Sequence, residues 1–201
     1  IAQCLVGSEM CIRDRFDVIA AHPDVAYALS HIRGDISNMV KMNAYEDSST
    51  AVKEFINGEE CHSKNTVLIR SIGRELSERY AEAVSKGIAR WQIILDPGIG
   101  FAKNGKQNLE IIRQLPLLKN YSCILPSGEF VNFSNIPILV GPSRKGFIGR
   151  ITKDDDPKDR DFATGSIIAS CIGLGADLVR AHNVKDCSKT VKIADALYKN
   201  V

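Results

Sequence analysis

Five polar side chains stand directly after short apolar runs, and their types suit binding of an anion or of a flat, hydrogen-bonding ligand. They are Asp96, Ser143, Lys145, Arg180 and His182. A carboxylate accepts two parallel hydrogen bonds from an amidine-like edge, whereas cations and hydroxyls bind oxyanions. The chemistry of this set therefore depends on whether the fold brings the residues to one place.

Asp96 opens a glycine-rich turn over residues 96–101 (DPGIGF). The proline fixes one dihedral angle and lacks an N–H donor, and the glycines allow the backbone to lie close to a ligand. One interpretation is a turn in which Asp96 caps neighbouring amides. The functional interpretation is a carboxylate that points into a site.

Residues 141–149 (GPSRKGFIG) combine a hydroxyl, two cations and a helix start. The N–H groups from Gly146 onward point out of the helix start, and the helix dipole adds positive potential there. This pattern predicts a site for an anion or a carbonyl. A solvated basic turn is the alternative.

Arg180 and His182 are two residues apart, so on an extended chain they project to the same side. An arginine fork and an imidazole are suited to holding a diphosphate. His31 and Arg33 have weaker context. We expect His31 to be structural and Arg33 to be a cation at the rim of the site.

Apolar runs alternate with helical patterns along the chain, which predicts βαβ units and a parallel sheet. Within the long helix, Glu75 and Arg79 are expected to pair on the exposed side. The polar stretch 119–135 is expected to form an insertion or small hairpin, and the stretch after Gly34 a polar loop with a weak helix. The expected strands are 25–30, 91–95, 136–140 and 177–180, and the expected helices are 65–88, one from about 108, 157–174 and 188–199.

All five candidate residues thus fall at the carboxyl ends of predicted strands, where parallel α/β folds bind ligands. The charge is balanced, with 26 Lys+Arg against 24 Asp+Glu, so we expect neither a nucleic acid nor a membrane as partner. The longest uncharged run, 162–176, is too short to span a bilayer. The six cysteines lack the spacing of a zinc site and are expected to be free thiols.

Three stretches resemble the carboxyl-terminal half of dihydropteroate synthase, the folate-pathway enzyme: ILDPGIGFAKNGKQNLEIIRQL, PILVGPSRKGFIG and RDFATGSIIASCIGLGADLVRAHNV. SHIRG is similar to a strand end of the same family. The resemblance covers residues 16–201 and, with the 119–135 insertion, is closest to the fungal form, the last domain of a trifunctional protein. It implies a TIM (β/α)8 barrel, of which this chain holds about the last four βα units.

The family condenses 6-hydroxymethyl-7,8-dihydropterin diphosphate with p-aminobenzoate and releases diphosphate. Carried over by motif, Asp96 and Lys145 would bind the pterin and act in catalysis. The p-aminobenzoate would lie against Phe101, with Ser143 and the helix start at Gly146 supporting it. The diphosphate would bind to Arg180 and His182. Asn183 departs from the family pattern, which commonly has Asp after the histidine.

The resemblance also implies bound Mg²⁺, whose ligand we expect in an amino-terminal half outside this chain, with no metal ligand in residues 16–201. It implies a homodimer in the cytoplasm, or in mitochondria. Residues 1–15 do not fit the pattern and are interpreted as a non-native segment. Because a complete barrel takes about 250 residues, we expect this chain to be inactive alone and to aggregate.

Two other functions stay open at this stage. A related pterin-binding methyltransferase barrel also uses an aspartate for the pterin edge, but a methyl donor has no diphosphate to lose, so Arg180 and His182 argue against it. A non-catalytic half-barrel that serves interactions is the other alternative. The presence of Asp96 and Lys145 together with Arg180 and His182 speaks against a half-barrel that has lost its catalytic residues.

Overall fold

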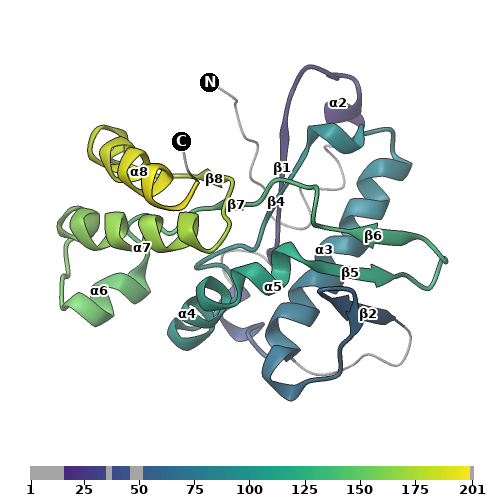
Figure 1. The fold of residues 1–201 in the computed structure, drawn as a ribbon, viewed down its shortest axis with the longest axis horizontal. Helices are drawn as coiled ribbons and strands as arrows, with labels where there is room; N and C mark the ends of the chain where they lie inside the picture. The colour runs from purple at the N-terminus through teal and green to yellow at the C-terminus, as the bar shows by residue number, and fades with distance from the viewer. Residues whose placement is uncertain (1–15, 35–37, 46–51, 200–201) are drawn as a thin grey trace.

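The computed structural model describes residues 16–34, 38–45 and 52–199. Helices and strands alternate along most of this part, which confirms the α/β class (Figure 1). In chain order they are α2 (Phe16–Ala20), β1 (Tyr27–Ser30), η1 (Met39–Lys41), β2 (Lys53–Ile56), β3 (Glu59–Glu60), η2 (Lys64–Thr66), α3 (Val67–Ser85), η3 (Arg90–Gln92), β4 (Ile93–Asp96), α4 (Gly105–Arg113), α5 (Leu115–Lys119), β5 (Tyr121–Ile124), β6 (Phe130–Asn132), β7 (Leu139–Val140), α6 (Gly146–Thr152), η4 (Pro157–Arg160), α7 (Asp161–Gly173), β8 (Leu178–Val179) and α8 (Val184–Tyr198).

Four parallel strands follow one another in chain order, as the sequence predicted. β1 pairs with β4 from Tyr27 opposite Ile93 to Ser30 opposite Asp96. A parallel bridge between Leu95 and Ile138 links β4 to the β7 segment, and β7 pairs with β8. Among the described residues, β1 pairs only with β4, and β8 pairs only with β7. The four parallel strands of this part of the chain therefore do not close into a barrel.

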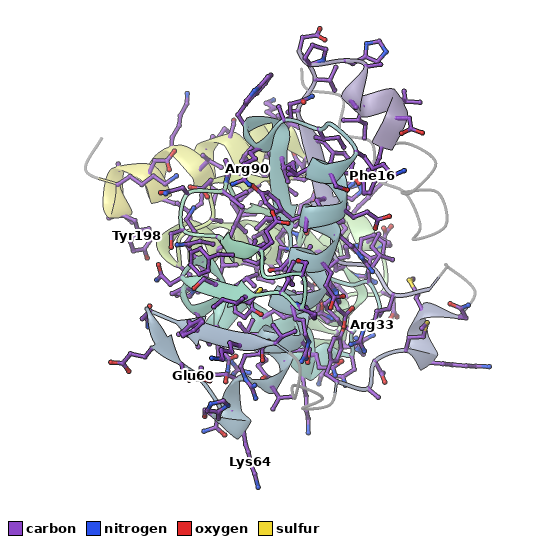
Figure 2. The ribbon with its side chains drawn as sticks, turned by 90° about the vertical axis from the view of Figure 1, so that its right-hand side faces the viewer. Phe16, Arg33, Glu60, Lys64, Arg90 and Tyr198 are labelled. Carbon is purple, nitrogen blue, oxygen red and sulfur yellow. The ribbon has the colours of Figure 1, made fainter. Side chains whose placement is uncertain are left out.

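Helix α3 supplies much of the core. Its apolar residues recur every four positions, and Leu68, Ile72, Leu76 and Tyr80 are all buried. The helix contacts β1 and β5, so it packs both the parallel strands and a second sheet. Lys64, just before the helix, is exposed and extends into solvent (Figure 2).

The second sheet is antiparallel, with strand order β3-β2-β5-β6. Its β5–β6 hairpin confirms the hairpin expected in 119–135. The expectation of a polar loop and a weak helix after Gly34 is wrong for residues 53–60, where β2 and β3 form a second hairpin. Strand β2 is four residues long and its partner β5 lies far along the chain, so its pairing depends on tertiary contacts that no local pattern encodes.

The expected exposed pair of Glu75 and Arg79 is also wrong. Glu75 is partly buried and bonds to His31 and Arg33, while the Arg79 guanidinium donates to the carbonyl oxygens of Ser30 and Ile32. Both residues face the end of β1 because α3 packs across it. The spacing of four residues on a helix would allow Glu75 and Arg79 to pair. Instead, both side chains bind groups at the end of β1.

Among the described helices, none combines the length and the apolar character that crossing a bilayer requires.

Candidate active site at the strand ends

Asp96 is the last residue of β4 and only 4% exposed. Ser30 Oγ, at the end of the neighbouring β1, donates to Asp96 Oδ2 at 3.0 Å, and the Gly98 N–H donates to Oδ1 at 2.8 Å. Burial raises the pKa of the Asp96 carboxyl, and these two hydrogen bonds oppose the rise. Asp96 therefore caps its own turn, and each oxygen retains a lone pair for a further donor.

The turn after Asp96 requires its glycines. Gly98 has φ +72°, and a Cβ there would lie 2.0 Å from the His31 carbonyl oxygen. Gly100 has φ +82°, and a Cβ there would lie 2.7 Å from Cδ of Lys145. The glycines thus allow the turn to lie against the end of β1 on one side and against Lys145 on the other.

Lys145 lies immediately before helix α6, and its ammonium reaches back over the turn. The Nζ atom lies 4.0 Å from the centre of the Phe101 ring, a cation–π contact. Burial lowers the pKa of Lys145, the positive charge of Arg180 lowers it further, and Asp96 opposes this. The charges of Asp96 and Arg180 thus both act on the Lys145 ammonium, which places the three residues near one another at the strand ends.

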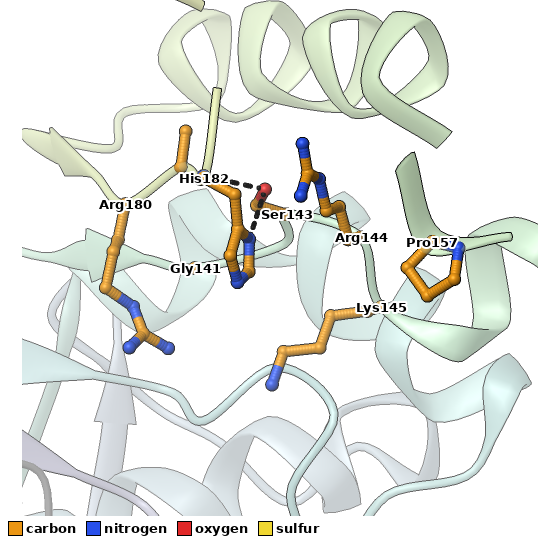
Figure 3. Close-up of a pocket in the computed structure, with 8 residues that line it drawn as sticks. Gly141, Ser143, Arg144, Lys145, Pro157, Arg180 and His182 are labelled. Carbon is orange, nitrogen blue, oxygen red and sulfur yellow. Dashed lines mark hydrogen bonds between the residues drawn. The ribbon is translucent and has the colours of Figure 1, made fainter. Parts of the chain in front are cut away.

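Arg180 and His182 line a cavity of about 600 Å³ together with Ser143 and Lys145. Figure 3 shows that the side chains of Arg180, His182 and Lys145 point into the same space. Arg180 and His182 are exposed, so both can contact a ligand from solvent. A Cβ on Gly141 would lie 3.3 Å from Arg180 Nε, so this glycine leaves room for the guanidinium.

Lys145 also lines a second cavity, of about 500 Å³. Gly146 lines it, together with Lys103, Asn104 and Arg150. Lys145 is the basic side chain common to both cavities. A ligand that extended from one cavity to the other would therefore pass this ammonium.

Arg144 does not act as a free cation of the site, contrary to the interpretation of 141–149 as carrying two. Its guanidinium donates to both carboxylate oxygens of Asp161, at 2.7 and 2.8 Å, and points away from Lys145 (Figure 3). Its backbone is left-handed, with φ 58°, and its N–H donates to Thr164 Oγ1. These bonds hold the strained turn that places Ser143 and Lys145.

Arg33 likewise is not a free rim cation. Its guanidinium bonds to Glu75 and lies 4.0 Å from the centre of the Tyr45 ring. His31 is fully buried, which confirms the expectation of a structural role.

Lys103 is a site residue that sequence reasoning missed. Its Nζ donates to the carbonyl oxygen of Phe101 at 2.9 Å and to Nδ1 of His31 at 2.9 Å. His31 Nε2 then donates to Glu75 Oε2 at 3.0 Å. Burial lowers the pKa of Lys103 to about 7. The available signal was its place two residues after Phe101 in the glycine-rich turn.

Asn183 stands where the resemblance expects an aspartate. It caps helix α8, because Oδ1 accepts from the Asp186 N–H. Its Nδ2 donates to Asp161 Oδ2 at 3.1 Å and to Asp186 Oδ2 at 3.0 Å. An amide therefore fits between two carboxylates here, where a third carboxylate could not donate.

The described residues hold no group of three or more His, Cys, Asp or Glu side chains that could bind a metal ion. Asp96 is the carboxylate next to Lys145 and Arg180, so a divalent cation bound to it would face two positively charged side chains. The residues at the strand ends therefore do not by themselves fit a Mg²⁺ ion.

Comparison with known proteins agrees with this geometry. The chain is 36% identical over 181 residues to a dihydropteroate synthase of Synechocystis sp., covering 90% of this chain and 51% of that protein. It is 39% identical over 177 residues to the folic acid synthesis protein fol1 of Pneumocystis carinii, covering 88% of this chain and 20% of that protein. The chain thus spans about half the length of the first relative and less of the second.

Solved structures show the same fold. The dihydropteroate synthase of Thermus thermophilus, in complex with 4-aminobenzoate, superposes with a TM-score of 0.71 at 24% identity, over 92% of this chain and 62% of that one. The likeness indicates a TIM-barrel-type α/β fold. The family profile described as pterin binding enzyme matches residues 13–182. The resemblance stated from the motifs is therefore confirmed, and the chain belongs to the pterin binding enzyme family.

Proposed function

We propose that this chain is the carboxyl-terminal half of a dihydropteroate synthase domain, with residues 16–201 as its last four βα units and residues 1–15 as a non-native segment. The observation that carries the proposal is the convergence of Asp96, Lys145, Arg180 and His182 at one strand edge. The relatives named dihydropteroate synthase support it.

In this proposal the pterin diphosphate lies with its amidine-like edge on Asp96 and its diphosphate on Arg180 and His182. The free lone pairs of the Asp96 carboxylate accept from the pterin 2-amino and N3 groups. As the bond between the pterin methylene carbon and the diphosphate oxygen breaks, Asp96 balances positive charge on the pterin. Arg180 and His182 hold the departing diphosphate.

The p-aminobenzoate lies against Phe101 and Lys145, with the helix start at Gly146 on its carboxylate side. Its amino nitrogen is already a nucleophile, so the site mainly positions it. That nitrogen attacks the methylene carbon, the diphosphate leaves with the electrons of the broken C–O bond, and the nitrogen loses a proton. No covalent intermediate with the protein is needed.

Mg²⁺ would neutralise charge on the bound diphosphate. The described residues do not fit the ion, and we propose that its ligand lies in the amino-terminal half of the complete domain. No step above depends on it.

We further propose a homodimer, supported by exposed apolar side chains of α7 and α8 such as Phe162, Ile193 and Leu197. Sedimentation of the complete domain would measure its mass. For the compartment we propose the cytoplasm or mitochondria, since a relative from Pisum sativum is described as mitochondrial. A fluorescent fusion in the source cell would distinguish these.

Product analysis tests the proposed activity. The complete domain, mixed with dihydropterin diphosphate and p-aminobenzoate, should release diphosphate and dihydropteroate in equal amounts, and neither product when one substrate is omitted. Methyl transfer to or from a pterin would instead support the methyltransferase. Pterin binding without turnover would support a non-catalytic module.

A further inference from the structure

Ser143 and His182 contact each other through two separate hydrogen bonds, although 39 residues separate them in the chain. The backbone N–H of His182 lies 3.1 Å from Ser143 Oγ, and the ring Nδ1 atom of His182 lies 2.9 Å from the same oxygen. Figure 3 shows both bonds. Ser143 is 5% exposed, whereas the imidazole extends toward the cavity.

Because the Ser143 hydroxyl has a single hydrogen, the direction of each of the two hydrogen bonds can be assigned. A backbone N–H can only donate, so Ser143 Oγ accepts there, and its one hydroxyl hydrogen remains to be used. Within the described part of the chain, His182 Nδ1 is the acceptor in reach of that hydrogen. The hydroxyl therefore donates to Nδ1, and the proton of the neutral imidazole is on Nε2.

We propose that Ser143 is a positioning residue that holds the His182 ring with an Nε2–H donor facing the cavity shared with Arg180 and Lys145. The proposal rests on the diphosphate site proposed above. It differs from the role of supporting p-aminobenzoate that the family resemblance implied for Ser143.

The arrangement makes His182 a donor in both of its protonation states. In the neutral ring Nδ1 accepts from Ser143 and Nε2–H faces the cavity. In the protonated ring Nδ1–H donates to Ser143 Oγ, and Nε2–H still faces the cavity. An oxyanion in the cavity thus meets an N–H in either state.

The serine itself is held firmly. It precedes Arg144, whose side chain is fixed by Asp161 and whose N–H is bonded to Thr164. The loop after β7 is therefore fixed to α7 through Arg144. Through Ser143, the same loop fixes the orientation of the His182 imidazole.

A double-mutant cycle on the complete domain tests the proposal, with binding of inorganic diphosphate as the readout. Ser143→Ala and His182→Ala should each weaken binding roughly tenfold, as expected for one charge-assisted hydrogen bond. The double variant should bind as weakly as His182→Ala alone, because Ser143 acts through the imidazole. Ser143→Thr should restore binding, and Ser166→Ala, on the exposed side of α7, should leave it unchanged.

Losses that add in the double variant would overturn the proposal, as would normal binding by Ser143→Ala when His182→Ala binds weakly. In the latter case the diphosphate site itself still stands. If neither His182→Ala nor Arg180→Ala weakens binding, the proposed diphosphate site fails as well.

A second measurement needs no variant at Ser143. In the ¹⁵N spectrum of histidine-labelled protein at alkaline pH, the His182 signal, assigned by its loss in His182→Gln, should show a protonated Nε2 and an unprotonated, hydrogen-bonded Nδ1. A protonated Nδ1 in the neutral ring would overturn the inference.

Discussion

Arg180 is the residue whose proposed role is most specific to one substrate. Of the two cavities at the strand ends, Arg180 lines the one that also holds His182, whereas Lys145 lines both. Arg180→Ala should therefore raise the KM for the pterin diphosphate by about 10- to 100-fold and change the KM for p-aminobenzoate by less than about twofold. Steady-state kinetics of the complete domain, with Arg113→Ala on the exposed face of α4 as the control, would measure both. Equal effects on both substrates would contradict the diphosphate role.

His31 should make the stability of the protein sensitive to acid. Burial, with Lys103 close by, lowers its pKa from 6.5 to about 3. The unfolded chain therefore takes up a proton before the folded one does, and stability falls as the pH drops below about 6.5. The free energy of unfolding should fall by up to about 1.4 kcal/mol for each pH unit.

Urea unfolding of the complete domain between about pH 6.5 and 5 would test this, because Glu75 and other carboxylates contribute mainly at lower pH. His31→Asn should lose this dependence, whereas His62→Asn, an exposed site, should retain it. If His31→Asn does not fold, calorimetry of the wild type should still show uptake of about one proton on unfolding at pH 5. No proton uptake would contradict the burial argument.

At the residue scale, the sequence predicted the site residues but not their partners. Asp96, Lys145, Arg180 and His182 stand out because polar groups after apolar strands gather at one edge. Arg144 has the same local signal and lines the same cavity, but its guanidinium is paired with Asp161. Such a partner depends on tertiary packing, which a single sequence does not encode locally.

At the scale of elements, the residue that caps helix α8 is an amide placed between two carboxylates. Asn183 lies between Asp161 and Asp186 and donates to both. Asn183→Asp should keep the helix cap, since aspartate also caps well, but should lose both donations and add a third negative charge. We expect a loss of about 1 kcal/mol in the free energy of unfolding.

Thermal unfolding of the complete domain would measure this change. Asn183→Ser, which keeps a capping oxygen without the charge, is the matched control and should lose less. Added salt should narrow the gap between the aspartate and serine variants, because it screens partly exposed charges. An aspartate variant as stable as the wild type at low salt would contradict the role of the amide.

The parallel strands and long helices could be predicted because their patterns are local and periodic. The antiparallel sheet could be predicted only in part. The β5–β6 hairpin is local, but β2 is held by β5 and by a buried ion pair between Glu54 and Arg70, with Tyr121 Oη donating to Glu54 at 2.9 Å. These three residues lie on three different elements, so no sequence window contains the signal.

At the scale of the molecule, strands β1 and β8 have one paired edge each among the described residues. These unpaired edges predict that the 201-residue chain expressed alone aggregates and has no turnover. Size-exclusion chromatography and a diphosphate-release assay would test it against the complete domain. A soluble monomer with a cooperative thermal transition and measurable turnover would contradict the proposal that the chain is half of a barrel.

Lys145 provides the most direct test of the central claim, that the edge formed by β4, β7 and β8 is a synthase active site. Lys145 lines both cavities, and its ammonium lies over the Phe101 ring. The measurement is dihydropteroate formation by the complete domain, wild type against Lys145→Ala, with Lys64→Ala as the exposed control. We predict that Lys145→Ala lowers kcat/KM by at least about 100-fold while Lys64→Ala is unchanged. Unchanged catalytic efficiency in Lys145→Ala, with the protein folded, would contradict the claim.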